Sequence, residues 1–208
     1  MTRLVLIGAG GHAKVLIELW RALGTLELVG CLSDAEGPAG VLGVPVLGGT
    51  ELLEVLRNEG VAHACVAVGD NGTRERLGAQ ATALGFALPA AIHPAALVSP
   101  SARIGAGAQV LARALVAADA RVEGLALLNH GAILDHDAVL GAAAHAAPGS
   151  SLAGGVRVGA RALIGVGAQV KPGVSIGADA VVGVGAAVIA DVPPGATVTG
   201  VPAQERSF

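Results

Sequence analysis

The chain has 208 residues, of which 53% are hydrophobic and only 14% are charged, and its net charge is −3 at pH 7. A disordered chain needs the opposite balance, so these figures indicate a folded protein, and the weak negative charge gives no electrostatic reason to bind nucleic acid. No apolar run approaches the roughly 20 residues that cross a bilayer, and the apolar start is too short for a signal peptide. We therefore expect a cytoplasmic protein with no membrane partner.

The first 88 residues alternate strand-like and helix-like segments. In chain order the pattern predicts strands at 3–7, 27–32, 44–47 and 62–68, and helices at 11–23, 51–58 and 73–84. Thr50 is expected to cap the helix that follows it. This order favours a small parallel sheet flanked by helices, an α/β Rossmann-like domain over residues 1–88. Cys31 and Cys65 fall in separate apolar segments, which is typical of reduced thiols in a protein core.

A glycine motif, Gly8-Ala9-Gly10-Gly11-His12-Ala13, lies between the first strand and the first helix. Glycines at this turn let backbone N–H groups approach a phosphate at the helix N-terminus, although a tight turn without a ligand has the same pattern. Asp34, after the second strand, is placed to hold a ribose hydroxyl, and Gly69 ends a strand at the same crevice. A nicotinamide cofactor fits this motif, but nothing downstream resembles a hydride site.

From residue 89 a repeat of six residues replaces the alternation. Stepping by six from Ile92 to Val188, sixteen of the 17 positions are Ile, Leu or Val, and thirteen of the 17 positions four residues later are Ala. One branched aliphatic and one small residue per hexad fit one face of a triangular parallel β-helix, with 18 residues per coil. We therefore predict an all-β domain over 89–208. The pattern alone leaves the hand of the coil open, and general crossover statistics favour a right-handed one.

Two histidines interrupt the repeat at its corners. Two residues after each aliphatic position the chain carries Pro, Ala, Gly or Val, except at His130 and His136. One coil after His136 comes Gly154, so a notch is expected beside the imidazole. His136 lies between Asp135 and Asp137, and an imidazole beside a carboxylate suits a general base.

Other polar residues on neighbouring coils have weaker signals. His145 follows His136 by nine residues and could contact an acyl donor, or it could be a surface imidazole. Asn129 lies on the same coil as His136, and His130 fits a surface role better than a catalytic one. His63 and His93 are expected to be structural. No nucleophile motif accompanies His136, so direct attack by an acceptor is simpler than an acyl-enzyme.

The chain resembles the bacterial sugar O- and N-acetyltransferases of the sialic acid O-acetyltransferase type, which include the bacillosamine-pathway and perosamine N-acetyltransferases. The resemblance covers nearly the whole chain. It rests on Ile7-Gly8-Ala9-Gly10-Gly11-His12, Ala67-Val68-Gly69-Asp70-Asn71, Ile92-His93-Pro94, Asn129-His130-Gly131, Asp135-His136-Asp137, Gly141-Ala142-Ala143-Ala144-His145 and Gly200-Val201-Pro202-Ala203.

This resemblance implies a left-handed hexapeptide-repeat β-helix, acetyl-coenzyme A as co-substrate, no metal, and a homotrimer with each active site between two β-helices. It implies that His136 is the general base and that Asp137 raises its basicity. For the donor it implies contacts with His145, Gly154, Val166 and Lys171. For the nucleotide sugar it implies Gly10, Gly11, His12, Ser33, Asp34 and Gly69, and we add Asn129 to the acceptor side.

We therefore expect acetyl transfer to a nucleotide-linked 4-amino-4,6-dideoxy sugar, in surface polysaccharide biosynthesis. One alternative is O-acetylation of sialic acid or another sugar. A second is a zinc enzyme of the γ-carbonic-anhydrase type, with His130, His136 and His145 as ligands across a trimer interface. A third is a non-catalytic nucleotide-binding scaffold, which leaves the two corner histidines unexplained.

Overall fold

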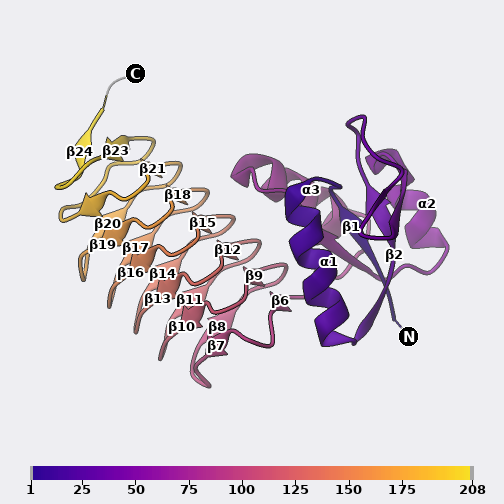
Figure 1. Cartoon of the computed structure of the whole chain (residues 1–208), viewed down its shortest axis with the longest axis horizontal. Coiled ribbons are helices and arrows are strands. Elements are labelled where there is room, and N and C mark those ends of the chain that lie inside the picture. The colour runs from indigo at the N-terminus through magenta and orange to yellow at the C-terminus, as the bar shows by residue number, and fades with distance from the viewer. Residues whose placement is uncertain (1, 207–208) are drawn as a thin grey trace. The chain divides into compact units, whose positions relative to one another are not determined.

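The computed structural model describes residues 2–206 and divides into two compact units, Met1–Pro94 and Ala95–Phe208 (Figure 1). This division falls six residues after the boundary expected at residue 88. Each unit has its own core, so we describe them one at a time.

The first unit is a five-stranded sheet with helices between its parallel strands. Its strand order is β3-β4-β2-β1-β5, and all neighbours are parallel except β3 and β4. With β2 in the middle, β1 beside it and helices in the crossovers, this is the predicted Rossmann-like arrangement. The elements are β1 (Thr2–Ile7), α1 (Gly11–Leu23), β2 (Leu26–Leu32), β3 (Gly40–Val41), β4 (Val44–Gly48), η1 (Thr50–Leu52), α2 (Leu53–Asn58), β5 (His63–Val66), α3 (Asn71–Ala83) and β6 (Ala91–Ile92).

The helix predicted over 51–58 differs from the observed one. A 3₁₀ turn forms first, α2 begins only at Leu53, and Thr50 makes no side-chain cap. The reason is a long-range contact, because the Thr50 N–H and hydroxyl both donate to the Asp34 carboxylate, at 2.6 and 3.1 Å. At α3 the cap is local, since Asp70 Oδ1 accepts from the Thr73 N–H at 2.8 Å.

Both cysteines of this unit are buried and free, as expected for core thiols. Cys31 in β2 and Cys65 in β5 lie on either side of β1, where each is in register with Leu6. Burial raises the pKa of the Cys65 thiol to about 11. Neither thiol is therefore poised to react.

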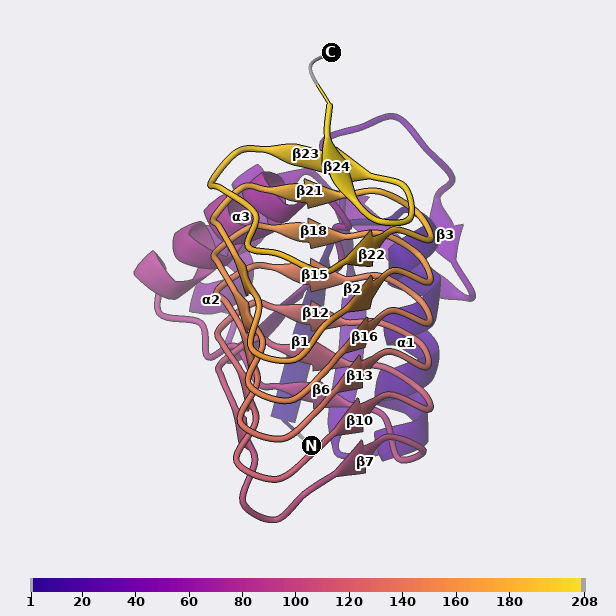
Figure 2. The ribbon, with the colours of Figure 1, turned by 90° about the vertical axis from the view of Figure 1, so that its left-hand side faces the viewer.

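The second unit is the predicted triangular coil, built from two-residue strands. From β7 to β19 each strand pairs in parallel with the strand 18 residues later, as in Leu115↔Ile133. Near the end of the coil β21 pairs in parallel with β23 at an offset of 16 residues, and β23 and β24 pair antiparallel. Figure 2 shows the strands of two faces stacked one above another, with β12, β15, β18 and β21 on one and β7, β10, β13 and β16 on the other. The strands are β7 (Leu97–Val98), β8 (Arg103–Ile104), β9 (Gln109–Val110), β10 (Leu115–Val116), β11 (Arg121–Val122), β12 (Leu127–Leu128), β13 (Ile133–Leu134), β14 (Val139–Leu140), β15 (His145–Ala146), β16 (Ser151–Leu152), β17 (Arg157–Val158), β18 (Leu163–Ile164), β19 (Gln169–Val170), β20 (Ser175–Ile176), β21 (Val181–Val182), β22 (Ala187–Val188), β23 (Thr197–Thr199) and β24 (Gln204–Glu205).

These strands form three faces, which we name after the strands of one coil. The β13 face holds β7, β10, β13, β16, β19 and β22, and the β14 face holds β8, β11, β14, β17 and β20. The β15 face holds β9, β12, β15, β18, β21, β23 and β24. We call the edge between the β13 and β14 faces the His136 corner, and the edge between the β15 and β13 faces the Asn129 corner.

The core of the prism is the aliphatic column predicted from the repeat. From Val110 to Val188 every residue of that column is buried, and so is the small-residue column from Ala108 to Val192. Ile92, Val98 and Ile104 are only half-buried, and for Val98 and Ile104 the second unit has no preceding coil. The narrow interior explains why the buried columns of the prism consist of aliphatic and small residues without aromatic side chains.

Candidate active site

The His136 corner places an imidazole and a carboxylate side by side. After β13 the chain turns, and from Gly107 to Gly185 the third residue beyond each aliphatic position takes a left-handed conformation, with φ of 58° at Asp137. Aspartate tolerates this region better than most residues because its short polar side chain bonds locally. Here the Asp137 Oδ2 atom lies 2.8 Å from His136 Nδ1. The turn that closes the coil therefore also orients the acid toward the ring.

The charges around His136 favour its protonated form. The hydrogen bond with Asp137 raises the pKa of His136 above its ordinary value, and the nearby charge of Asp135 adds to this effect. Asp135 is itself fixed, because its Oδ1 accepts from the His136 backbone N–H at 2.7 Å. The imidazole is 62% exposed, so a substrate can reach it.

The hydrogen bond to Asp137 also decides which ring nitrogen is available. A carboxylate only accepts, so the neutral ring carries its proton on Nδ1 and leaves the lone pair on Nε2. Gly154 stacks against this end of the ring, as the repeat predicted. A Cβ atom at position 154 would lie 2.5 Å from His136 Nε2, so only glycine leaves the nitrogen open to a ligand.

Lys171 shares the His136 corner, one coil beyond Gly154. It follows β19, in the position that Asp135 occupies two coils earlier, and its side chain is exposed. The structure therefore brings together four of the predicted residues along one corner: His136, Asp137, Gly154 and Lys171.

The remaining predicted residues of the β-helix lie elsewhere on the prism. His145 begins β15, and its Nε2 accepts from the Asn129 side-chain amide at 3.0 Å. Val166 lies on the Asn129 corner, where it is 48% exposed. His130 is exposed on the same corner, and its backbone N–H donates to Asn129 Oδ1 at 2.8 Å. Within one chain, His145, Asn129 and Val166 are therefore not gathered around His136.

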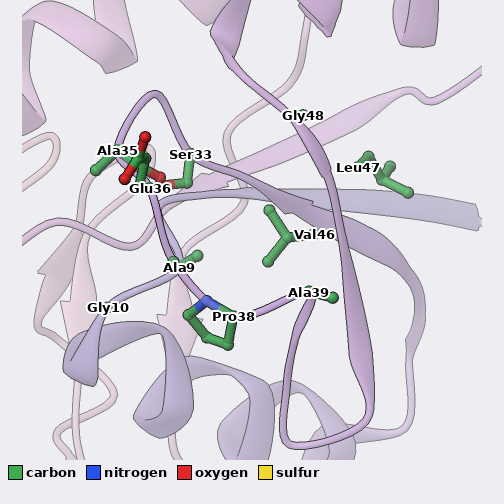
Figure 3. A pocket seen from close by; sticks show the side chains of 11 residues that line it. Ala9, Gly10, Ser33, Ala35, Glu36, Pro38, Ala39, Val46, Leu47 and Gly48 are labelled. Carbon is green, nitrogen blue, oxygen red and sulfur yellow. Dashed lines mark hydrogen bonds between the residues drawn. The ribbon is translucent and has the colours of Figure 1, made fainter.

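In the first unit, the glycine turn opens onto a cavity of about 490 Å³ (Figure 3). Gly8 is required at the turn, since its φ is 121° and a Cβ atom there would lie 2.5 Å from the Ala67 carbonyl oxygen. Gly10 precedes α1 and Ser33 follows β2, and both line the cavity, while their contact with a nucleotide stays a prediction. Its lining is Ala9, Gly10, Ser33, Ala35, Glu36, Gly37, Pro38, Ala39, Val46, Leu47 and Gly48.

The structure gives Asp34 a different role from the predicted ribose contact. Both carboxylate oxygens accept hydrogen bonds from Thr50, and Asp34 does not line the cavity. The carboxylate that does line it is Glu36, which the sequence analysis missed. Its position on the loop after β2, two residues past Asp34, was the available signal.

Gly11, His12 and Gly69 are also absent from the cavity lining. The Gly69 carbonyl accepts from Arg74 Nη1 at 2.9 Å, so the buried Arg74 side chain holds the loop between β5 and α3. Burial lowers the pKa of Arg74 to about 10, but the guanidinium stays charged at neutral pH. The contact of Gly69 with a nucleotide stays a prediction.

Across residues 2–206, no group of three or more His, Cys, Asp or Glu side chains is arranged to hold a metal ion. In the same part of the chain, every helix is too short or too polar to span a bilayer.

Residues 3–81 match the family described as the PglD N-terminal domain. The whole chain is similar to perosamine N-acetyltransferase from Caulobacter crescentus, solved as a His-to-Asn variant in complex with CoA and GDP-perosamine. The two are 48% identical over 100% of this chain and 98% of that chain, with a TM-score of 0.97. A His-to-Ala variant of the same enzyme has also been solved with both ligands.

The chain is similar to two further solved proteins. The acetyltransferase domain of PglB from Neisseria gonorrhoeae FA1090, in complex with acetyl coenzyme A, is 43% identical over 98% of both chains, with a TM-score of 0.93. WeeI from Acinetobacter baumannii AYE is 24% identical over 99% of this chain and 100% of that chain, with a TM-score of 0.89, which shows the shared fold alone. Comparison with curated protein sequences yields no match.

Proposed function

This chain belongs to the hexapeptide-repeat sugar N-acetyltransferases, with their left-handed β-helix, and we propose that its acceptor is a nucleotide-linked 4-amino-4,6-dideoxy sugar. The observation that carries the proposal is the His136–Asp137 pair, whose Nε2 atom is kept open by Gly154. The solved relative with GDP-perosamine makes that compound the first acceptor to test.

In the proposed reaction, the sugar amine attacks the thioester carbonyl of acetyl-coenzyme A. The amine N–H proton passes to His136 Nε2 as the C–N bond forms, and Asp137 stabilises the imidazolium through Nδ1. The tetrahedral intermediate then collapses, the C–S bond breaks, and coenzyme A leaves as a thiolate that takes the proton from His136. We assign the counterpart of the histidine replaced in the Caulobacter enzyme to His136.

The ligands are assigned to two places. The nucleotide occupies the cavity at the glycine turn, where Gly10 offers its backbone to a phosphate and Ser33 and Glu36 offer polar side chains. Acetyl-coenzyme A lies along the His136 corner, past Gly154 and Lys171. Both are cytoplasmic metabolites, and we propose a cytoplasmic location in surface polysaccharide biosynthesis for that reason.

We propose a homotrimer in which neighbouring chains complete each site. His145, Asn129 and Val166 lie on the β15 face and the Asn129 corner, away from His136 in the same chain. If a second β-helix presents this surface to the His136 corner, His145 can contact the acetyl carbonyl or the thioester arm. The zinc alternative would likewise need histidines from more than one chain.

The test is release of coenzyme A from acetyl-coenzyme A with GDP-, UDP- and dTDP-linked 4-amino-4,6-dideoxy sugars and with free sialic acid. We expect release with one of the amino sugars, and a loss of turnover on the order of 10²–10⁴-fold in His136→Ala. Release with sialic acid alone would make the protein an O-acetyltransferase. A His136→Ala variant that keeps the wild-type rate would exclude the base mechanism.

A further inference from the structure

A second polar hollow adjoins the His136 corner on the β14 face. It has a volume of about 290 Å³, and its lining consists almost entirely of charged side chains from successive coils. The lining residues are Ser101, Arg103, Asp119, Arg121, Asp137 and Arg157. Three of the six are arginines, and a fourth is the partner of the proposed base.

The coil register stacks these arginines into a ladder. Arg103 of β8 is directly in register with Arg121 of β11, and Arg157 of β17 lies two coils beyond Arg121 on the same face. Neighbouring strands are about 4.8 Å apart, and like charges directly opposite each other destabilise a sheet. Solubility alone does not explain why Arg103 lies opposite Arg121, because charged residues at unaligned positions would give the same solubility without the repulsion.

Two carboxylates, Asp119 and Asp137, line the hollow together with the three arginines, but neither is bonded to them. In the part of the chain that the structure describes, the guanidinium groups of Arg103, Arg121 and Arg157 form neither an ion pair nor a side-chain hydrogen bond. The Asp137 carboxylate in the same hollow is bonded to His136. By contrast, Arg161 on another corner pairs with Asp179 through two bonds of 2.7 and 2.8 Å. This β-helix can therefore neutralise an arginine, but it leaves these three unpaired.

Three guanidinium groups outnumber the two carboxylates of the hollow and have no bonded partner, so they suit an oxyanion. The planar fork of arginine matches phosphate oxygens with two parallel hydrogen bonds, and adjacent arginines can hold adjacent phosphates. We propose that Arg103, Arg121 and Arg157 form a phosphate-binding site for one of the two substrates, beside Asp137. The inference rests on the proposed function, in which the phosphates come either from the nucleotide sugar or from coenzyme A.

The first experiment is a binding measurement that needs no turnover. Inorganic pyrophosphate is titrated by calorimetry into the full-length wild-type protein and into Arg103→Gln, Arg121→Gln and the double variant. We expect at least tenfold weaker binding in the double variant, and weaker wild-type binding at high salt because the site is exposed. Arg113→Gln is the matched control, since Arg113 is an exposed arginine of the same β-helix outside the hollow.

Steady-state kinetics then identify the source of the phosphate. A tenfold or greater rise in KM for the nucleotide sugar alone assigns the site to the acceptor, and the same rise for acetyl-coenzyme A alone assigns it to the donor. Either result supports the proposal when kcat changes little and Arg113→Gln behaves like wild type.

Two outcomes overturn the proposal. One is unchanged pyrophosphate affinity and unchanged KM values in the double variant. The other is unchanged affinity with loss of the oligomer, which would mean that the arginines hold a second copy of the chain. The two proposals can fail separately. If the wild-type protein turns over no amino sugar but binds pyrophosphate more tightly than the arginine variants do, the proposed function is wrong and the phosphate-binding site is supported.

Discussion

At the residue scale, the proposed chemistry depends on the His136–Asp137 pair, in which the backbone and the side chain of Asp137 have different roles. Asp137 closes the corner in a left-handed conformation and also accepts from His136 Nδ1. The first role needs a residue that tolerates positive φ, and raising the basicity of the ring through the second needs the negative charge of a carboxylate. Asparagine meets the first requirement and not the second, so Asp137→Asn separates them.

Asp137→Asn is expected to move the acid limb of the pH–rate profile to lower pH. A general base works when neutral, and the raised pKa of His136 means that wild-type activity is lost as pH falls through a value above 6.5. Without the carboxylate that pKa drops, and the plateau rate drops because the imidazolium is less stabilised. Profiles of kcat against pH check this. Asp179→Asn, at the same turn position on another corner, should leave the limb in place.

Asp34 and Glu36 are expected to have separable roles. Asp34→Ala removes two hydrogen bonds from Thr50 and should lower the free energy of unfolding by about 1–2 kcal/mol, with little change in KM. Glu36→Gln should raise KM for the nucleotide sugar without changing stability, because the side chain lines the cavity and is exposed. Denaturant titrations and kinetics on both variants test this, and the reverse pattern would restore the ribose role of Asp34.

At the element scale, each coil repeats one turn, so a site is made by changing single positions of that turn. Position 136 carries an imidazole where other coils carry small residues, and position 154 loses its side chain to make room for it. The hexads around both keep their buried columns. The β-helix can therefore host the site without disturbing its core.

Gly154→Ala is expected to reduce kcat sharply while leaving the protein folded. The added methyl group would lie 2.5 Å from His136 Nε2, so the ring must move or the nitrogen is covered. Gly124→Ala is the matched control, because it occupies the same turn position and its methyl group would meet only the Ala106 carbonyl oxygen, at 3.4 Å. Kinetics and thermal unfolding of both variants check the prediction, and equal activities would contradict it.

At the scale of the whole molecule, two groups of predicted site residues lie on different parts of one prism. His136, Gly154 and Lys171 share a corner, whereas His145 lies on the β15 face with Asn129. A single chain therefore presents two halves of the proposed site, and the trimer proposal brings the halves of neighbouring chains together.

Mixed oligomers test this arrangement directly. His136→Ala and His145→Ala should each be slow alone, but co-expression of both is expected to restore part of the wild-type activity. Restoration follows because some sites then combine an intact His136 with an intact His145 from the next chain. Sedimentation of wild-type protein should give a trimer. Mixtures no faster than the better single variant would place both histidines in one chain's site.

Several features of this protein were determined by the sequence alone. The six-residue period predicts the coil, its buried columns and the 18-residue register, because each hexad buries one aliphatic and one small side chain at the same two positions. The register in turn identifies His136 as an anomaly and Gly154 as its neighbour. The glycine turn and the α/β order of the first 88 residues are likewise local patterns.

Tertiary structure decided what depends on residues far apart in the chain. Asp34 bonds to Thr50, 16 residues away, and this contact cannot be read from the local pattern around either residue. Arg103, Arg121 and Arg157 look like ordinary surface residues in their own hexads, and only stacking of the coils gathers them into one hollow. The separation of His145 from His136 also needed the three faces. The repeat pattern depends on neighbours in the sequence, so it shows which side chains are buried. The partner of a side chain depends on which other coil, strand or chain packs against it, and only the tertiary structure shows that.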